Sequence, residues 1–397
     1  MRRALAVAFF TVACGPGRAP SPPVAMTIRP VGTSDAPTVA TAVDPETAEA
    51  PLQMAFAGNR LCVRSDGRVY CQPSTGSPVS PLVQDELRVA GVEDAIDLSG
   101  NRSLMCVATR RGTVMCAGTN THGELGARAE DEETDHFVEV VGVAHARRVA
   151  AGITHACALL DDKSVKCWGR NDHGQTGSDT YYMPQARLLA TATLVPGVKA
   201  ESVAAGNEST CARTPERQVV CWGMQQDQGP RMKAARWTNE RPTRIPDLDD
   251  VSALQAQDEG YCAIRRGRVL CWGQARRLIP GTDYFGSGIV SVADLKDIQQ
   301  VALSDSHACA RHGDGRVSCF GYPYTGALGR PQPSDPTKQY DAVTPTLVEP
   351  LPRAKFVGAG GTLSCALTSN NDVYCWGRWY TDGGTHDEPS PISIQLR

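Results

Sequence analysis

The chain has 397 residues, with 40 Lys and Arg against 43 Asp and Glu, and with 38 Gly, 27 Pro and 15 Cys. Its formal net charge of -3 argues against a protein that tracks nucleic-acid phosphates, because such proteins carry a basic excess or a basic stripe. Only 6% of the residues are aromatic and turn-forming residues are abundant, so an average helical enzyme is not expected. Beyond the N-terminus, no apolar run approaches the roughly 18 residues that a membrane-spanning helix needs.

Residues 1–13 have the pattern of an export signal. Arg2 and Arg3 precede an apolar stretch that runs to Ala13, and the stretch ends in Thr-Val-Ala-Cys at residues 11–14. A positive start followed by an apolar segment and small residues is typical of secretory signals. The tetrapeptide resembles a bacterial lipobox, with Thr11 where Leu is usual, so we predict that Cys14 is lipidated and becomes the mature N-terminus. The alternative is an ordinary secretory peptide followed by an unrelated cysteine.

Residues 14–51 follow as a Pro-rich tether. Gly15 to Pro51 contains eight prolines and no aromatic residue. A segment of this composition cannot bury enough apolar surface to fold. We therefore expect a disordered spacer between the lipidated Cys14 and a folded domain of residues 52–397.

The other fourteen cysteines form seven close pairs, each enclosing eight or nine residues. The pairs recur about every 50 residues, a period typical of propellers or solenoids. The spacer differs from the two- to four-residue knuckle of a structural zinc site, and paired cysteines behind an export signal favour disulfides. The predicted disulfides are Cys62–Cys71, Cys106–Cys116, Cys157–Cys167, Cys211–Cys221, Cys262–Cys271, Cys309–Cys319 and Cys365–Cys375.

Each cysteine pair encloses a β-hairpin. In residues 62–71, Asp66-Gly67 is a strong turn signal, because both central residues of a type I′ turn need a positive φ. Counting outward places Cys62 opposite Cys71, at a Cα separation of about 4.5–5.5 Å that suits a disulfide. The residue after the second cysteine is large in most repeats and usually faces a small one, which conserves volume in a packed interior. These large residues are predicted to be core: Trp168, Trp222, Trp272, Phe320 and Trp376.

Two further strand candidates flank each hairpin. An apolar stretch such as Ser202–Gly206 precedes it, and a short strand such as Thr193–Val195 follows after a longer loop. Four strands in each of seven repeats, without helical periodicity, predict an all-β fold: a seven-bladed β-propeller of four-stranded blades, with one disulfide-linked hairpin per blade. Blades 1 and 7 should adjoin, with Leu52–Phe56 starting the first blade and Ile392–Leu396 as the final short strand; the pattern leaves open whether this strand caps blade 7 or crosses into blade 1.

The repeats resemble those of the regulator of chromosome condensation family. Residues 152–177 contain Gly-x-x-His-x-Cys-Ala-Leu and then Val-x-Cys-Trp-Gly-x-Asn-x-x-Gly-Gln, and other repeats keep parts of this signature, such as Trp222-Gly223. The resemblance implies a propeller that acts as a binding platform, and it favours an exchange of strands between the chain ends. The namesake's exchange activity on a small GTPase is not expected, because the leader and the cysteines point outside the reducing compartment. Secreted bacterial members whose propeller face inhibits an enzyme are better analogues.

The sequence carries no recognisable catalytic motif. The eight histidines form no HExxH motif or close ligand cluster, and His155 and His307 share one repeat position, which indicates a structural role. No nucleophile elbow, phosphate loop or dinucleotide fingerprint occurs in the right context. We expect no enzymatic activity, no catalytic residue, no metal and no cofactor, with a glycoside-cleaving pair of loop carboxylates left open as the alternative.

The hairpin turns should all lie on one face of the propeller, so the segments after Cys-Trp-Gly leave from the opposite face. These segments are long and rich in Tyr, Trp and Arg, which are enriched at binding hot spots. Residues 124–135 hold six acids and one base, or -5, while residues 231–244 hold five bases and one acid, or +4. The predicted binding residues are Tyr181, Tyr182, Arg231, Arg236, Trp237, Arg241, Tyr322, Tyr324, Trp379 and Tyr380.

Together these patterns predict a non-enzymatic, monomeric protein-binding scaffold of the bacterial cell envelope. It is anchored to the membrane through a lipid on Cys14 alone, or secreted, and it binds a protein at the cell surface rather than nucleic acid. The alternative hypothesis is recognition of a carbohydrate or envelope polymer, in which exposed aromatic rings would stack on sugars.

Overall fold

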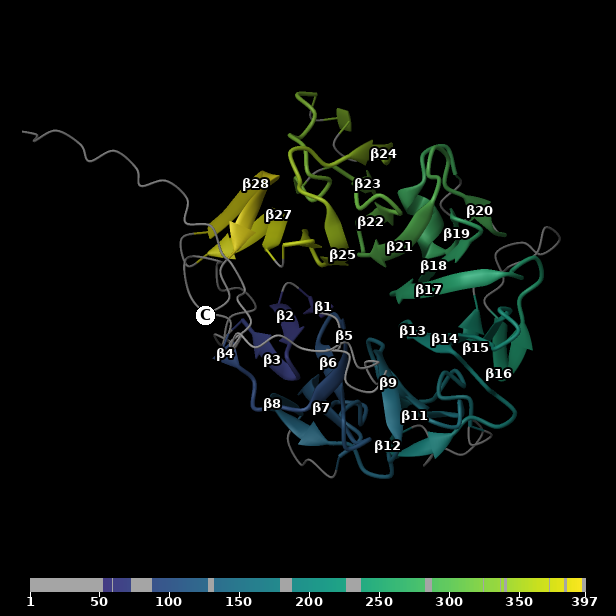
Figure 1. Ribbon diagram of the computed structural model, residues 1–397. Helices are drawn as coiled ribbons and strands as arrows, with labels where there is room; N and C mark the ends of the chain where they lie inside the picture. Colours follow the sequence, from purple (N-terminus) through teal and green to yellow (C-terminus); the bar gives the residue numbers. More distant parts are fainter. Residues whose placement is uncertain are drawn as a thin grey trace, which may run out of the picture.

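The computed structural model describes residues 53–58, 60–72, 88–127, 132–178, 188–225, 237–282, 288–323, 325–335, 337–338, 341–370, 372–381 and 384–394. The predicted export signal at 1–13, the predicted lipidation site Cys14 and the predicted tether at 14–51 lie outside the described residues. Within them, 28 strands form seven four-stranded antiparallel sheets. Figure 1 shows these sheets arranged as blades around a central axis, in chain order. The expected seven-bladed β-propeller is confirmed.

Each blade contains four strands that are consecutive in the sequence, with the first of the four nearest the axis. Blades 1 to 4 contain, in order, β1 (Gln53–Ala57), β2 (Arg60–Ser65), β3 (Arg68–Cys71) and β4 (Arg88–Val89); β5 (Ala95–Asn101), β6 (Leu104–Thr109), β7 (Val114–Thr119) and β8 (Glu133–Glu139); β9 (Ala146–Ala151), β10 (His155–Leu160), β11 (Val165–Arg170) and β12 (Leu188–Leu194); and β13 (Ser202–Ala205), β14 (Ser209–Arg213), β15 (Val219–Gln225) and β16 (Trp237–Arg244). Blades 5 to 7 contain β17 (Val251–Gln257), β18 (Gly260–Arg265), β19 (Arg268–Gly273), the short 3-10 helix η2 (Gln274–Leu278) and β20 (Val290–Ser291); β21 (Ile298–Leu303), β22 (His307–His312), β23 (Val317–Gly321) and β24 (Val343–Leu347); and β25 (Ala354–Gly360), β26 (Leu363–Thr368), β27 (Val373–Thr381) and β28 (Gly384–Ile394).

All seven predicted disulfides are present, one in the central hairpin of each blade, with Cα separations of 4.0–4.2 Å. The strand register agrees with the count made from the turn: Cys62 lies opposite Cys71, and Val63 lies opposite Tyr70. Each bridge therefore joins directly opposed residues of adjacent strands, and no disulfide among the described residues links two blades.

The large residues after the second cysteine are core, as predicted. Trp168, Trp222, Trp272, Phe320 and Trp376 are all 0% exposed. Three of the indoles also hydrogen-bond to the preceding blade: Nε1 of Trp168 donates to Glu124 O (2.8 Å), that of Trp222 to Gln175 O (2.9 Å) and that of Trp376 to Ala327 O (2.8 Å).

Trp272 differs from the other core tryptophans because it lies opposite Tyr261 rather than a small residue. The two rings stack with their centroids 5.5 Å apart. The Tyr261 hydroxyl hydrogen-bonds to Ser209 Oγ at 2.7 Å, whereas Trp272 Nε1 has no hydrogen-bond partner among the described residues. The stacked rings lie within blade 5, and at its junction with blade 4 the tyrosine hydroxyl makes the polar contact in place of an indole hydrogen bond.

His155 and His307 have the structural role that their shared repeat position indicates. His155 Nε2 lies 2.7 Å from Thr210 Oγ1, whose hydroxyl donates to Gln175 O. His307 Nε2 likewise lies 2.7 Å from Ser364 Oγ, whose hydroxyl donates to Ala327 O. Each histidine thus donates from a neutral ring to the next blade, and burial lowers the pKa of each to about 4.

The ring closes without an exchange of strands, so the expectation drawn from the family resemblance is wrong. β28 pairs with β27 in blade 7, and among the described residues blade 1 contains only β1 to β4. Closure depends instead on packing: Phe56 of β1 lies against Gly358 and Gly360 of β25, where a Cβ on Gly360 would be only 2.2 Å from that of Phe56. Glycine at these positions lets the blade 7 backbone approach the aromatic ring.

Candidate functional site

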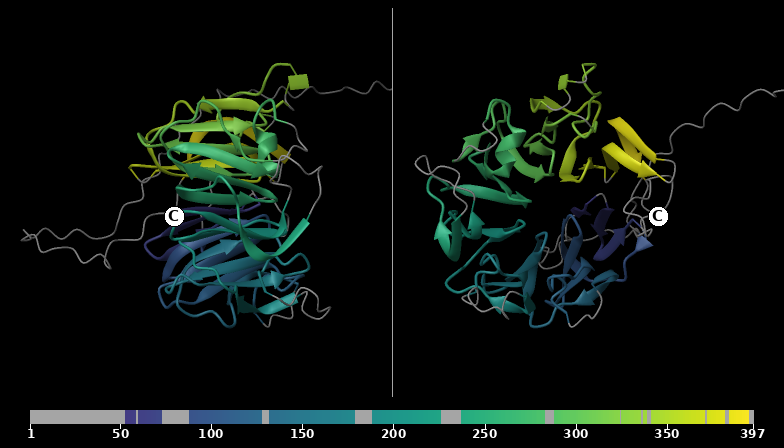
Figure 2. Two further views of the ribbon diagram at one scale, coloured as in Figure 1. Left: turned by 90° about the vertical axis from the view of Figure 1, so that its right-hand side faces the viewer. Right: turned by 180° about the vertical axis from the view of Figure 1, so that it is seen from behind.

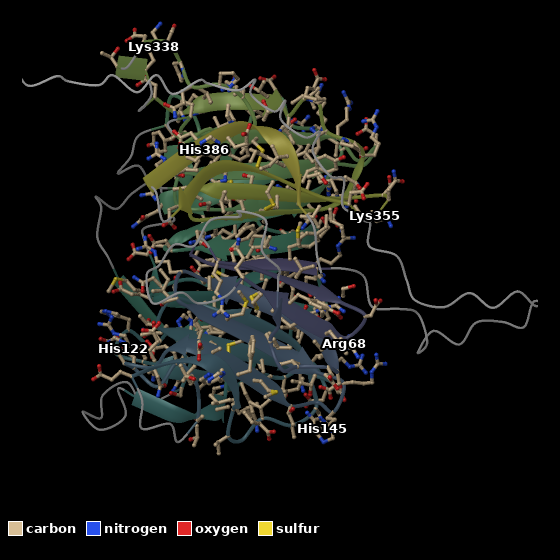
Figure 3. The ribbon with its side chains drawn as sticks, turned by 90° about the vertical axis from the view of Figure 1, so that its left-hand side faces the viewer. Arg68, His122, His145, Lys338, Lys355 and His386 are labelled. Atoms are coloured by element: carbon tan, nitrogen blue, oxygen red, sulfur yellow. A yellow bond between two sulfur atoms is a disulfide. The ribbon has the colours of Figure 1, made fainter. Side chains whose placement is uncertain are left out.

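The propeller has two chemically different faces. One face carries the turns between the second and third strands of each blade and also the connections between blades. We call it the turn face. The opposite face, with the connections that follow the first and third strands, is the loop face. The left view of Figure 2 shows the disc from its edge, and Figure 3 places Arg68, His145 and Lys355 on the turn face and His122, Lys338 and His386 on the loop face.

The turn face is closed by a hydrogen bond that recurs between successive blades. Ala95 N, at the start of β5, donates to Gly67 O in the hairpin turn of the preceding blade (2.7 Å). Ion pairs such as Arg111 with Asp94 (2.9 Å) lie over these connections. The same backbone bond joins Ala146 to Gly112, Ala200 to Lys163, Val251 to Arg217, Ile298 to Gly267 and Ala354 to Gly315.

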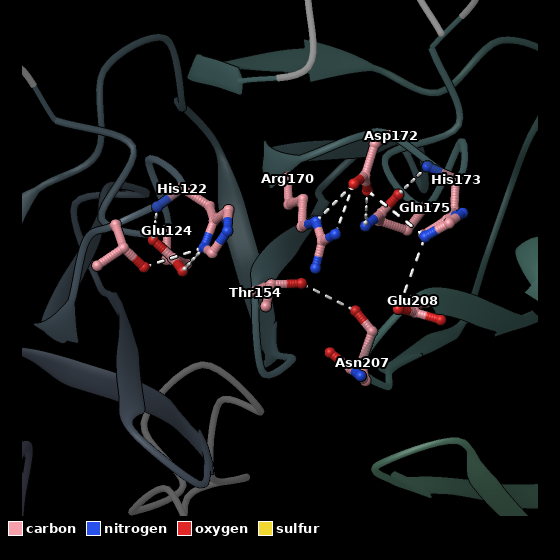
Figure 4. Close-up of polar contacts among 10 residues, drawn as sticks. His122, Glu124, Thr154, Arg170, Asp172, His173, Gln175, Asn207 and Glu208 are labelled. Atoms are coloured by element: carbon pink, nitrogen blue, oxygen red, sulfur yellow. Dashed lines mark hydrogen bonds and ion pairs between the residues drawn. The ribbon is translucent and has the colours of Figure 1, made fainter.

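On the loop face, a polar cluster lies where blades 3 and 4 meet (Figure 4). Arg170 donates from Nε and Nη2 to Asp172 Oδ2, at 2.8 and 2.6 Å. His173 Nε2 lies between Asp172 Oδ1 (3.9 Å) and Glu208 Oε1 (3.6 Å). Partial burial opposes ionisation of Asp172, but the bonds from Arg170 outweigh it and lower the pKa of that carboxyl. Thr154 Oγ1 donates to Asn207 O (3.0 Å) and joins the two blades.

The backbone of this cluster is fixed by its own side chains. Asn171 Oδ1 accepts from Thr176 N (3.0 Å), and Gln175 Oε1 accepts from His173 N (2.9 Å). Gly174 has a φ of 76°, in the left-handed region that glycine tolerates. Blade 2 repeats the arrangement, with Asn120 Oδ1 accepting from Leu125 N and Glu124 Oε2 accepting from His122 N.

An axial channel of about 250 Å³ runs between the innermost strands. Its mouth on the loop face is bridged by Arg102, which follows β5. Arg102 Nη2 lies 3.1 Å from Asp258 Oδ2 and 3.2 Å from Asp305 Oδ2. These carboxylates belong to blades 5 and 6, on the far side of the ring from blade 2, because two blades intervene in either direction. Burial raises the pKa of Asp258, and the positive charge of Arg102 only partly opposes this increase.

The described structure does not bring the predicted binding residues together. Arg241 is exposed on β16, and Tyr322, which follows β23, is partly buried against the core between blades 5 and 6. Trp237, Trp379 and Tyr380 have described backbones only. Five predicted residues lie outside the described part of the chain: Tyr181, Tyr182, Arg231, Arg236 and Tyr324. Their binding role stays a prediction.

Two segments that we interpreted as loops are strands. Residues 237–244, with Trp237 and Arg241, form β16, and Trp379 and Tyr380 lie in β27. The β27–β28 hairpin continues beyond the core, with Trp379 opposite His386 and Tyr380 opposite Thr385. Aromatic and β-branched residues favour extended, half-buried backbone, which explains why the pairing continues there.

The acidic segment 124–135 is not one solvated loop. Glu124 is 1% exposed and its carboxylate accepts a backbone hydrogen bond, while residues 133–135 belong to β8. The channel mouth was missed altogether. The sequence feature that could have revealed it is a shared repeat position: Arg102, Asp258 and Asp305 each lie four residues before the first cysteine of their blade.

Neither a metal centre nor a membrane-spanning element is found in the described part of the chain. No group of three or more His, Cys, Asp or Glu residues there could hold a metal ion. No described helix is long and apolar enough to cross a membrane.

The fold and its repeated core contacts define a disulfide-bonded, seven-bladed β-propeller. The Regulator of chromosome condensation (RCC1) repeat model matches residues 146–175 and 354–378, so these two segments are similar to that repeat and the resemblance seen in the sequence is confirmed. The chain is 26% identical over 335 residues to the Regulator of chromosome condensation of Drosophila melanogaster, covering 77% of this chain and 59% of the fly protein. It is also 26% identical over 286 residues to E3 ubiquitin-protein ligase HERC2 of Mus musculus, covering 68% of this chain but 6% of that protein.

Solved structures agree on the fold. Yeast RCC1 (Prp20), in a crystal structure with Kap60, has a TM-score of 0.67 at 18% identity, covering 93% of this chain and 91% of that one. Human WBSCR16 has a TM-score of 0.64 at 18% identity, covering 75% and 81%. Prp20p from Saccharomyces cerevisiae, described with its binding properties to Gsp1p and histones, has a TM-score of 0.61 at 20% identity, covering 76% of each chain.

Proposed function

We propose that the protein is a non-enzymatic binding scaffold of the bacterial cell envelope, and that its loop face binds a protein partner. The observation that carries this proposal is the contrast between the two faces. Main-chain groups of the turn face bond to one another across successive blades. The turn face also carries exposed ion pairs such as Arg111 with Asp94, whereas the loop face holds partly buried charge in the Arg170–Asp172–His173 cluster and around the channel mouth.

A rigid scaffold with variable connections on one face is a common basis for recognition. Yeast Prp20, which shares the fold, is described as bound to Kap60 and as binding Gsp1p and histones. These partners belong to that protein, and they support only the general idea that such a propeller can bind proteins. For this chain, the partner should be a protein of the cell surface.

The proposed location rests on cysteine chemistry and on the leader. Seven disulfides suit an oxidising environment and are rare in reducing compartments. Export by residues 1–13 and lipidation of Cys14 would hold the propeller at the membrane, with residues 15–51 as the spacer. Replacement of Cys14 by Ser should release the protein from the membrane fraction, and retention of the variant would contradict lipid anchoring.

Capture from solubilised native envelope tests the proposed face. The full chain serves as bait beside a loop-face variant, Trp237→Ala with Arg241→Ala, and a turn-face control, Arg111→Ala with Arg353→Ala. A specific protein retained by the parent and the control, and lost with the loop-face variant, would support the proposal. Equal loss with both variants would contradict it, and retention of purified envelope polysaccharide instead of protein would favour the carbohydrate hypothesis.

A further inference from the structure

The channel mouth contains one residue from each blade at the same repeat position, four residues before the first cysteine. In every blade this position falls in the turn between the first and second strands. Only one of the seven residues is basic and two are acidic. They are Gly58, Arg102, Ile153, Asn207, Asp258, Asp305 and Gly361.

The two carboxylates at the mouth are more buried than the arginine that bridges them. Gln257 Nε2 donates to Asp305 Oδ1 (2.8 Å), and Arg277 donates from Nη2 to the Asp305 carbonyl. The Asp258 side chain is only 17% exposed. Arg102, in contrast, reaches across from blade 2, and its side chain is 50% exposed. The mouth therefore has two partly buried acceptors bridged by one half-exposed donor.

Two carboxylates share this one guanidinium, so the pair retains a net negative charge. Glu259 adds further negative potential beside Asp258, and Arg277 partly offsets it. A planar guanidinium can donate to two carboxylates at once, which a lysine ammonium does less well. An exposed ion pair contributes little free energy, so exchanging Arg102 for another guanidinium costs little.

We propose that the mouth binds one arginine side chain of the protein partner between Asp258 and Asp305, and that Arg102 occupies this place in the free protein. The inference rests on the proposed function and names the group that the partner presents. Arg102 then acts as an internal competitor. Its removal should strengthen binding of an external guanidinium, which a purely structural role for Arg102 does not predict.

The test uses the full chain and a defined probe, the blocked peptide Gly-Gly-Arg-Gly-Gly, with the matching citrulline peptide as its neutral isostere. Binding is followed by NMR titration. Arg102→Gln should bind the arginine peptide about fivefold more tightly than the parent does, because the competing charge is gone. Arg102→Lys should fall between the two. Arg102→Gln combined with Asp305→Asn should lose the gain, and the turn-face control Arg353→Gln should behave as the parent, with thermal melts establishing that each variant is folded.

Equal affinity of parent and Arg102→Gln, or equal binding of the citrulline peptide, would overturn the inference. Stronger binding of free agmatine than of the peptide would also overturn it, in favour of a small-cation site. If the peptide behaves as expected but capture from the envelope fails, the arginine site stands and the protein-binding function fails. If capture depends on the loop face but the peptide does not respond to Arg102, only the arginine site fails.

Discussion

The two faces of the propeller use the same strands but satisfy their polar groups in different ways. On the turn face, backbone bonds such as Ala95 N to Gly67 O recur between blades and do not depend on side-chain identity. On the loop face, the turns after β7 and β11 depend on particular side chains, as where Gln175 Oε1 accepts from His173 N. The backbone bonds of the turn face can therefore tolerate sequence change, whereas the loop-face turns that rely on side chains cannot.

The loop face is also the one that the core tryptophans hold in place. Gln175 O accepts both from Trp222 Nε1 and from the Thr210 hydroxyl, and Ala327 O accepts both from Trp376 Nε1 and from the Ser364 hydroxyl. A carbonyl on one blade is thus fixed by two donors from the next. This coupling links the order of a surface loop to the packing of the adjacent blade.

The largest effect is expected from Trp168→Ala, which removes a fully buried ring and the bond to Glu124 O. Loss of such a ring costs about 3–5 kcal/mol in the free energy of unfolding. The ring packs between blades 2 and 3, so hydrogen exchange should rise in residues 120–126 and in β10 and β11. Denaturant titration measures the loss.

A comparison of Trp168→Phe with Trp272→Phe in the same denaturant titration isolates the contribution of the indole hydrogen bond. The first change removes an indole hydrogen bond as well as volume, whereas Trp272 Nε1 has no described partner to lose. Trp168→Phe should therefore cost about 1–3 kcal/mol more, from the unsatisfied Glu124 carbonyl. Equal costs would show that the indole bonds do not stabilise the loop face.

Acid should destabilise the histidine-linked loop face before it affects the turn face. Burial lowers the pKa of His155 and His307 to about 4, from an ordinary value near 6.5. The unfolded chain therefore binds more protons between these values, and stability is lost as the pH falls from about 6.5 towards 4. Each pKa unit corresponds to about 1.4 kcal/mol. His155→Gln should flatten the stability profile in this window, and a profile identical to that of the parent would contradict the neutral, buried assignment.

The blade plan could be predicted from the sequence because it is local. A disulfide-linked hairpin is determined by a turn signal and by residues within ten positions, so Cys62 and Cys71 could be paired by counting. A large residue follows the second cysteine in five of the seven repeats, and this repetition distinguished core positions such as Trp222 from surface positions. Ring closure was harder to predict from the sequence. The packing of Phe56 on Gly360 joins residues at opposite ends of the chain, and this contact does not recur in a repeated pattern.

The site was less predictable for a related reason. Arg102 meets Asp258 and Asp305 only because the ring brings blades 2, 5 and 6 around one axis, and no local pattern encodes that distance. Composition drew attention to Trp237 and Trp379 instead, since these residue types are frequent at interfaces. Their backbones turned out to extend the strands, which shows that composition alone does not separate a loop from a strand end.

Binding should depend on the loop face through Trp237, which is not at the repeated core position. A buried tryptophan anchor at an interface is worth about 2 kcal/mol or more, or roughly thirtyfold in affinity. Trp237→Ala should weaken partner binding by that factor without lowering the melting temperature, whereas Arg236→Ala should act mainly on the salt-dependent association rate. Calorimetric titration and thermal melts on the same variants measure both. A lower melting temperature with unchanged affinity would place Trp237 in the core.

The smallest effect is expected on the turn face, where Arg111→Gln removes an ion pair with Asp94. The Arg111 side chain is 69% exposed, so water screens the pair. The backbone bond from Ala95 N to Gly67 O remains and needs neither side chain. The free energy of unfolding should stay within about 0.5 kcal/mol of the parent, and raising the salt concentration should remove even that difference. A loss above 1 kcal/mol that persists in high salt would show that side chains, and not the repeated backbone bonds, hold the turn face together.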